Sequence, residues 1–150
     1  MNSVCARQAS PGAIHLPHTT DGRLAGADGA ALTVYHGSTV PGITRFDTHR
    51  VNGDEVGAFF SDSWAEAATY GSAIYAAHLR IRNPYVVTAD AWGHGRGLSP
   101  IDARDRGHDG YAILDMECAD GGCATTYIAF IPDQILLLPA RSRAACGDSV

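Results

Sequence analysis

Residues 111–130 read YAILDMECADGGCATTYIAF, and this stretch decides more about the fold than any other part of the chain. Two runs rich in apolar, β-branched and aromatic residues, 111–118 and 123–130, flank a short connector. At its centre stand Asp120 and Gly121, a pair typical of a two-residue hairpin turn, because both central positions of that turn take positive φ. The stretch therefore predicts an antiparallel β-hairpin.

The expected turn also fixes which residues lie opposite each other. With the Asp-Gly pair at its centre, Asp115 is expected to face Thr126, and Glu117 is expected to face Ala124. Directly opposed residues hold their Cβ atoms about 4.5 to 5.5 Å apart. Because side chains alternate between the two faces of a strand, both acidic residues are expected on the same face as Thr126.

Upstream of the hairpin, the sequence predicts short strands and short helices joined by glycine-rich loops. Alternation of apolar and polar residues marks the strands, and an Ala-rich stretch after the capping candidates Ser61 and Asp62 marks a helix. The expected strands are residues 32–36 and 74–82, the expected helices run from the cap to Tyr70 and over residues 101–106, and residues 92–100 are an expected loop.

The composition favours a single domain and argues against a nucleic-acid partner. The chain has 150 residues, 45% of them hydrophobic, which suffices for one core. The net charge is -5 and no basic run occurs, whereas phosphate backbones are bound by clustered Lys and Arg. We expect a flexible leader over residues 1–31, which lack periodicity, a domain over residues 32–140, and a tail over residues 141–150.

Neither a signal peptide nor a membrane span is expected. Residues 1–12 lack the apolar run of about seven residues that a secretory signal needs. Apolar stretches such as residues 135–138 are far shorter than the roughly 20 residues of a membrane-spanning helix. We therefore expect a soluble protein that is made in the cytoplasm and has no membrane partner. We also expect it to be a monomer.

The cysteines do not form a metal-binding pattern. Cys118 and Cys123 are close in sequence, but no second pair of cysteine or histidine residues accompanies them at metal-ligand spacing. We expect all the cysteines to be free thiols. The predicted hairpin places Cys118 opposite Cys123, where a disulfide could form outside the cell, but cytoplasmic reduction favours two small apolar side chains.

Four short segments stand in a characteristic order along the chain. They are YHGST at residues 35–39, GAFFSD at residues 57–62 with Tyr70, RGHDGY at residues 106–111, and YIAF at residues 127–130 followed by Gln134 and Ile135. Together they resemble the ADP-ribosyltransferase superfamily over about residues 32 to 138. They are similar to its His-Tyr-Glu branch, which includes diphtheria-like toxins, poly-ADP-ribose polymerases and small phage or bacterial transferases.

The resemblance implies an α+β fold with a split β-sheet core and a few short helices, and it implies NAD as the substrate. It implies that the His36 side chain hydrogen-bonds the adenosine ribose and that the backbone of Gly37 holds the nicotinamide amide. Ser38 completes that motif. It also implies that Phe59 and Tyr70 sandwich the nicotinamide ring. Phe59 stands where the family usually has tyrosine, which keeps the stacking surface and loses the hydroxyl.

One position departs from the family pattern, because the residue before Tyr127 is the catalytic glutamate in the family and is Thr126 here. A carboxylate there stabilises the positive charge that develops on the ribose when the bond to nicotinamide breaks. Three possibilities stay open: the domain binds NAD without turnover, it transfers slowly without the carboxylate, or another acid replaces it. The expected hairpin register makes Asp115 the first candidate for that acid and Glu117 the second.

The function that these features imply is mono-ADP-ribosyl transfer from NAD to a macromolecular target, in the first place a protein. The setting implied is a bacterial effector, a toxin or a phage counter-defence protein that reaches its target cell by a route without a signal peptide. One alternative is an NAD glycohydrolase, in which water replaces the acceptor. The other is a degenerate module that binds NAD or ADP-ribose without turnover.

Overall fold

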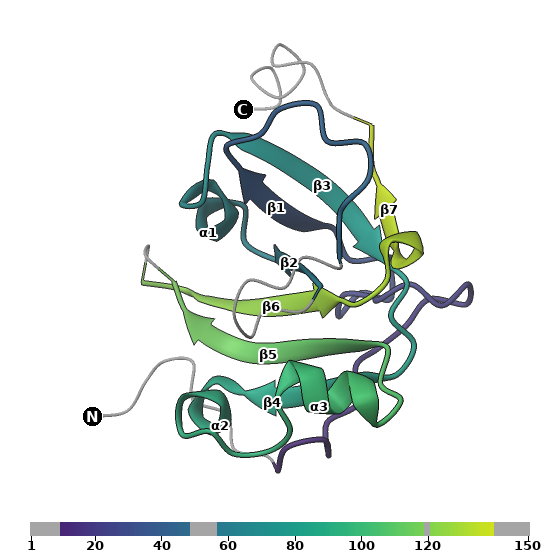
Figure 1. Cartoon of the computed structure of the whole chain (residues 1–150), viewed down its shortest axis with the longest axis vertical. Coiled ribbons are helices and arrows are strands. Elements are labelled where there is room, and N and C mark those ends of the chain that lie inside the picture. Colours follow the sequence, from purple (N-terminus) through teal and green to yellow (C-terminus); the bar gives the residue numbers. More distant parts are fainter. Residues whose placement is uncertain (1–9, 49–56, 119–120, 140–150) are drawn as a thin grey trace.

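A single mixed sheet organises the fold. The computed structural model describes residues 10–48, 57–118 and 121–139, and these contain one seven-stranded sheet in the order β4-β5-β6-β2-β1-β3-β7 (Figure 1). The strands are β1 (Val34–Ser38), β2 (Ala58–Ser61), β3 (Ala73–Leu79), β4 (Pro84–Thr88), β5 (Gly110–Glu117), β6 (Cys123–Ala129) and β7 (Ile135–Leu137). The helices are α1 (Trp64–Ala68), α2 (Ala89–Gly93), α3 (Pro100–Asp105) and the 3-10 turn η1 (Pro132–Gln134). The expected α+β class is confirmed.

The sheet divides into two halves that β2 joins. In Figure 1, β1, β3 and β7 lie on one side of β2, and β4, β5 and β6 lie on the other. β1 pairs with β3 from Val34 to Ser38, whereas its pairing with β2 is confined to Tyr35 and Ser61. β2 pairs with β6 along its whole length. The narrow connection between β1 and β2 corresponds to the split core expected from the sequence.

The hairpin of β5 and β6 forms, but Asp115 does not face Thr126. Opposite Thr126 lies Ile113, and the register shifts between Ile113 and Met116 through a β-bulge. Asp115 sits inside the bulge with a φ of 61°, and within the described ranges it is the only residue other than glycine with a positive φ. Aspartate tolerates this left-handed conformation because its short side chain can hydrogen-bond locally. The expected pairing of Asp115 with Thr126 is therefore wrong.

The register also differs at the turn. The Cys118 N–H donates to the Gly122 carbonyl at 2.9 Å, and the Gly121 N–H donates to the Cys118 carbonyl at 3.0 Å. Gly121 has a φ of 84°, which glycine adopts without strain. As a result Glu117, and not Cys118, lies opposite Cys123. The aspartate of the expected turn lies outside the described residues.

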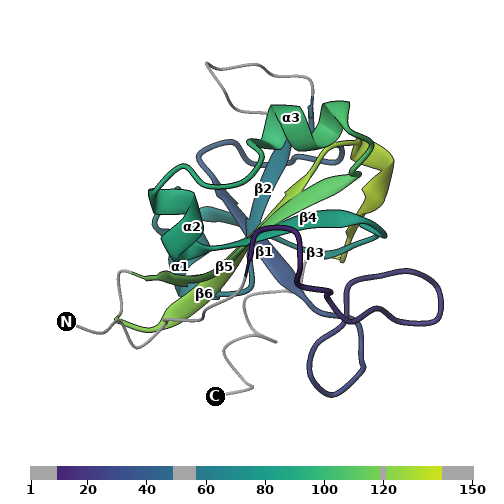
Figure 2. The ribbon, with the colours of Figure 1, turned by 90° about the horizontal axis from the view of Figure 1, so that it is seen from below.

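Two apolar clusters cover the two faces of the sheet. Successive residues of β6 belong to different clusters, Tyr127 to the first and Ile128 to the second, as the period-two alternation of a strand requires. The second cluster also includes Ala91 of α2 and Ala103 of α3. Figure 2 shows these two helices on the same side of the sheet. The first cluster reaches β1 and β3, so both halves of the sheet share it.

Residues 10–31, which belong to the expected flexible leader, pack against the sheet. Leu24 is 2% exposed, belongs to the first cluster, and donates its N–H to the Leu79 carbonyl at 2.8 Å. The Gly12 N–H likewise donates to the Val86 carbonyl at 2.8 Å. These contacts fix an irregular backbone, which has no periodicity that a sequence pattern could reveal. The boundary at residue 31 stays a prediction, and the expected tail lies outside the described residues.

Several short elements differ from the sequence expectation. α1 is capped by Ser63, whose Oγ accepts from the Glu66 N–H at 3.1 Å, and not by Ser61 or Asp62. β4 and α2 were not expected from the sequence. β4 pairs in parallel with β5 and is buried over most of its length. Its apolar run therefore lacks the alternation that marks a half-exposed strand. The helix expected at residues 101–106 is confirmed as α3. Across the described ranges, each helix is too short or too polar to traverse a bilayer.

Candidate functional site

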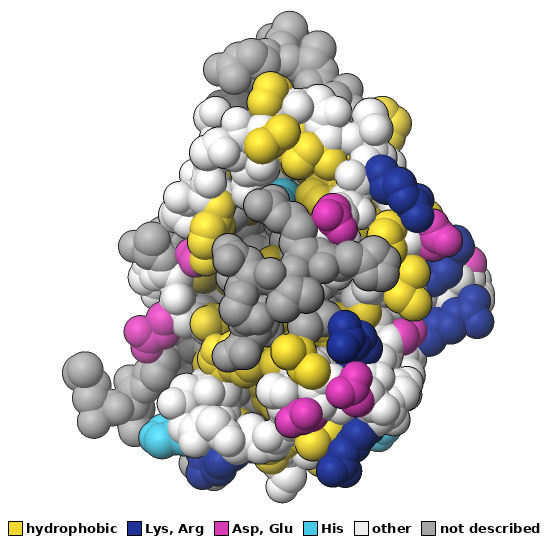
Figure 3. Space-filling view, in the orientation of Figure 1, with side chains coloured by type: hydrophobic (Ala, Val, Ile, Leu, Met, Phe, Trp, Pro, Cys, Tyr) yellow, Lys and Arg dark blue, Asp and Glu magenta, His cyan; other side chains and the backbone are white. Residues whose placement is uncertain are grey.

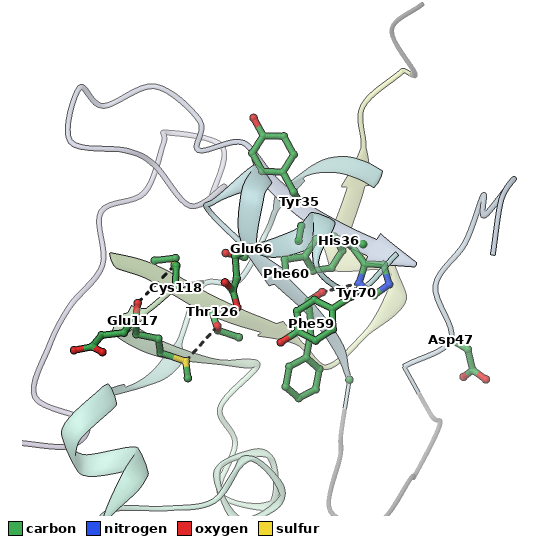
Figure 4. Close-up of a pocket in the computed structure, with 16 residues that line it drawn as sticks. Tyr35, His36, Asp47, Phe59, Phe60, Glu66, Tyr70, Glu117, Cys118 and Thr126 are labelled. Carbon is green, nitrogen blue, oxygen red and sulfur yellow. Dashed lines mark hydrogen bonds between the residues drawn. The ribbon is translucent and has the colours of Figure 1, made fainter. Parts of the chain in front are cut away.

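A pocket of about 480 Å³ opens between β1, β2, α1 and the turn end of the β5–β6 hairpin. Its lining combines aromatic side chains with several polar and acidic ones. Figure 4 shows the residues that line it: Tyr35, His36, Gly37, Asp47, Gly57, Phe59, Phe60, Ser61, Glu66, Ala67, Tyr70, Met116, Glu117, Cys118, Ala124 and Thr126. A pocket of this size and composition is suited to a small organic ligand.

His36 is held in one tautomer by the backbone of the neighbouring strand. Its Nδ1 lies 2.6 Å from the Phe59 carbonyl oxygen, which can only accept, so Nδ1 carries the hydrogen. In the neutral ring, Nε2 is then an acceptor. Phe46 and Phe60 fix the ring plane, with ring centroids 4.7 Å and 5.6 Å from that of His36. The ring is therefore oriented before any ligand arrives.

Gly37 allows α1 to lie directly on β1. A Cβ atom on Gly37 would stand 1.7 Å from the Ala67 carbonyl oxygen, a distance that no side chain permits. Both residues line the pocket, so this close approach sets the distance between the histidine strand and the helix. Ser38, the third residue of the motif, is not among the lining residues, and its Oγ accepts from the Val40 N–H at 3.0 Å.

Phe59 and Tyr70 both line the pocket, as the resemblance implied (Figure 4). Phe59 lies on β2 and is half-buried, whereas Tyr70 follows α1 and is 68% exposed. The neighbouring ring of Phe60 belongs to the core and is 2% exposed. One aromatic wall is thus part of the sheet, and the other stands at the mouth of the pocket.

Among the expected catalytic residues, Thr126 and Glu117 line the pocket and Asp115 does not. The Thr126 Oγ1 donates to the Met116 sulfur at 3.5 Å. Glu117 is an exposed residue at the last position of β5. The β-bulge separates Asp115 from Thr126, so the geometric reason for choosing Asp115 as the replacement acid is lost.

Asp115 instead contributes to the electrostatics around Asp62. Burial raises the pKa of the Asp62 carboxyl, and the negative charge of Asp115 adds to that rise. The Thr125 N–H donates to the Asp62 Oδ1 at 2.9 Å, which opposes the increase in pKa. Asp62 is exposed as a whole residue, but its carboxylate lies against the β6 backbone. Desolvation of the carboxylate therefore makes the largest contribution to the rise in its pKa.

Glu66 lines the pocket, although the sequence did not indicate it as a catalytic candidate. It lies on α1, is half-buried and lines the pocket with Thr126 and His36. In Figure 4 its carboxylate points into the pocket toward Thr126. The spacing of Ser63 and Glu66 in the sequence is that of a helix cap. This spacing indicates an acidic residue on the first turn of the helix, but it does not indicate the direction of the carboxylate.

The cysteines also differ from the expectation. Cys118 keeps its thiol, whose Sγ donates to the Met116 carbonyl at 3.8 Å, and it lines the pocket. Cys123 is disulfide-bonded, although not to Cys118. The expectation that all the cysteines are free thiols is therefore wrong for Cys123. The described ranges hold no group of three or more His, Cys, Asp or Glu residues that could bind a metal ion.

The sequence of the chain matches one family model over most of its length. The family is described as ADP-ribosyltransferase in polyvalent proteins, and the match covers residues 26–136. The chain belongs to this family. The matched range includes every residue that lines the pocket, so the ADP-ribosyltransferase resemblance of the sequence is confirmed. No curated protein and no solved structure matches the chain.

Proposed function

We propose that this ADP-ribosyltransferase domain uses NAD and transfers a single ADP-ribose to a macromolecular target, in the first place a protein. The observation that carries the proposal is that one pocket brings together His36 from β1, Phe59 from β2 and Tyr70 from just beyond the end of α1. These three residues come from different parts of the fold, and each corresponds to an NAD-contacting position of the family. Their convergence supports a site for the adenosine ribose and the nicotinamide ring of NAD.

The tautomer of His36 supports a role in binding a ribose. With Nδ1–H donating to the Phe59 carbonyl, the neutral ring offers Nε2 as an acceptor for a ligand hydroxyl. Phe59 offers an aromatic face that the nicotinamide ring can stack on, and Tyr70 can close over it from the mouth. Together these groups account for a hydrogen bond to the adenosine ribose and for stacking on the nicotinamide ring.

The reaction needs little covalent chemistry from the protein. The bond between ribose C1′ and the nicotinamide nitrogen breaks, and neutral nicotinamide leaves with the bonding electron pair. A nucleophile of the target then forms a bond to C1′ and releases its proton. Because positive charge develops on the ribose in between, the main contribution of the protein is to hold the ring, exclude water and supply negative charge.

The surface around the pocket supports a protein as the acceptor. Trp64 at the start of α1 is 57% exposed, and Tyr70 just beyond its end is 68% exposed. Exposed aromatic side chains are typical anchors of protein interfaces. On the face shown in Figure 3, basic side chains lie mixed with acidic ones instead of forming one patch. The biological setting that we propose is a bacterial effector, a toxin or a phage counter-defence protein.

NAD labelled in its adenylate half tests the proposal. We expect label on protein when the full chain, labelled NAD and an extract of candidate target cells are combined, together with an equal amount of released nicotinamide. Label that appears only as free ADP-ribose would identify an NAD glycohydrolase. Binding without nicotinamide release would identify a binding module, and either result would overturn the proposed transfer.

A further inference from the structure

We propose that Glu66 of α1 supplies the catalytic carboxylate that position 126 lacks. This inference rests on the proposed function, because it assigns the negative charge that NAD cleavage requires. In this proposal the acid comes from α1, on the opposite wall of the pocket, and not from the β5–β6 hairpin.

Glu66 and Thr126 lie on facing parts of the pocket. Both line it, and Thr126 pairs across the sheet with Ser61, the last residue of β2 before the cap of α1. Figure 4 shows the Glu66 carboxylate directed toward Thr126. A carboxylate that enters from α1 therefore reaches the region that a glutamate at position 126 would occupy from β6.

The capping role that an acid usually has at this helix position is filled by another residue. In a capping box, the third helical residue accepts from the N–H of the cap residue. Here the Ser63 N–H donates to the Ser61 Oγ at 3.1 Å, while the Ser63 Oγ accepts from the Glu66 N–H at 3.1 Å. The helix start is thus capped without the Glu66 carboxylate, which turns toward the pocket.

The helix that carries Glu66 is held in place by close packing. Ala67 is buried, and its carbonyl oxygen occupies the space that a side chain on Gly37 would fill. His36 precedes Gly37 and is itself fixed by its hydrogen bond to the Phe59 carbonyl. The carboxylate and the imidazole are therefore held by the same junction of α1 with β1. Such preorganisation is what makes a fixed charge effective in a transition state.

The other acids near the pocket are less suited to this role. Among the described residues that line the pocket, the acids are Asp47, Glu66 and Glu117, and only Glu66 is half-buried while the other two are exposed. A charge that is partly shielded from water interacts more strongly with a developing positive charge than an exposed one does. Asp115 does not line the pocket.

The decisive variant is Glu66→Gln, which keeps the shape of the side chain and removes its charge. We expect nicotinamide release at saturating NAD to fall by about 100-fold or more, while the Kd for NAD in calorimetry changes by less than about threefold. The matched control is Asp102→Asn. Asp102 occupies the same position of α3, where its N–H donates to the Ser99 Oγ at 3.2 Å, but it does not line the pocket. We expect this control to keep turnover within about threefold.

A rescue experiment separates a catalytic role from a merely structural one. In the Glu66→Gln background, Thr126→Glu returns a carboxylate to the pocket from β6, and we expect it to recover turnover by about tenfold or more. If Glu66→Gln unfolds, Glu66→Asp decides the question, because it keeps the charge and should keep measurable turnover below that of the wild type. Wild-type turnover in Glu66→Gln would overturn this inference alone. Absence of nicotinamide release by the wild-type chain would overturn both the inference and the proposed function.

Discussion

The carbonyl oxygen of Ala67 lies where a side chain on Gly37 would have to be, 1.7 Å from the position of its Cβ. This contact joins α1 to β1 and sets the width of the pocket between His36 and Glu66. The glycine of the His-Gly motif is thus required by packing in this protein, independently of any ligand.

Gly37→Ala is expected to destabilise the domain. The clash is with a backbone atom, which cannot move without shifting α1, so we expect a loss of about 3 kcal/mol in the free energy of unfolding. Gly93→Ala serves as the control, because nothing lies within 4 Å of a Cβ at that position and alanine is favoured over glycine in a helix. Denaturant unfolding of both variants measures the difference. Equal stability of the two variants would show that α1 does not depend on Gly37.

His36→Ala is expected to weaken NAD binding by about tenfold, because a lost hydrogen bond to a ligand is typically worth about 1 to 1.5 kcal/mol. Calorimetric titration with NAD measures the change. His94→Ala is the control, since His94 is an exposed residue next to α2 and does not line the pocket. Unchanged NAD affinity in His36→Ala would remove His36 from the site.

Tyr70→Ala is expected to reduce turnover more than Tyr70→Phe, because we assign the ring to stacking on nicotinamide and not the hydroxyl to proton transfer. Tyr70 is 68% exposed, so neither change should lower the free energy of unfolding by more than about 0.5 kcal/mol. The initial rate of nicotinamide release measures the effect. Equal losses in the two variants would point to the hydroxyl and contradict the stacking role.

Asp62→Asn is expected to stabilise the protein slightly at neutral pH. The pKa of the Asp62 carboxyl is raised in the folded state, first by burial and further by the charge of Asp115, so ionisation of this group opposes folding. The charged Asp62 carboxylate lowers the free energy of unfolding when the pH is above its pKa in the folded protein. This destabilisation is lost as the pH falls through that pKa toward the ordinary value of 3.8. Asparagine keeps an oxygen to accept from the Thr125 N–H. Unfolding curves from pH 7 to pH 4 test this, and a wild-type advantage at pH 7 would contradict it.

The sequence allowed the main elements of the fold to be predicted, but not the register of the hairpin. Both strands of the hairpin were predicted because their apolar runs and the Asp-Gly pair are local signals. The bulge at Asp115 was not, since nothing in the residues between Ile113 and Met116 marks where the pairing shifts. One shifted position moves Asp115 away from Thr126, which is enough to change the choice of the acid.

The residues of the candidate site were likewise predicted only in part. His36, Phe59, Tyr70 and Thr126 were predicted to belong to it, because family positions at strand and helix ends converge once the sheet forms. Glu66 was missed because its spacing from Ser63 is that of a structural helix cap. Only the hydrogen bond of the Ser63 N–H to Ser61 reveals that the cap does not use the carboxylate, and that contact cannot be read from residue spacing.

The most direct test of the account is mass spectrometry of proteins from candidate target cells after incubation with NAD and either the wild-type chain or Glu66→Gln. We expect that the wild-type chain adds one ADP-ribose to a target protein with release of one nicotinamide, and that the variant does so at a rate lower by about 100-fold or more. The account would be contradicted if the wild-type chain bound NAD but produced neither modified protein nor nicotinamide, or if Glu66→Gln modified the target as fast as the wild type.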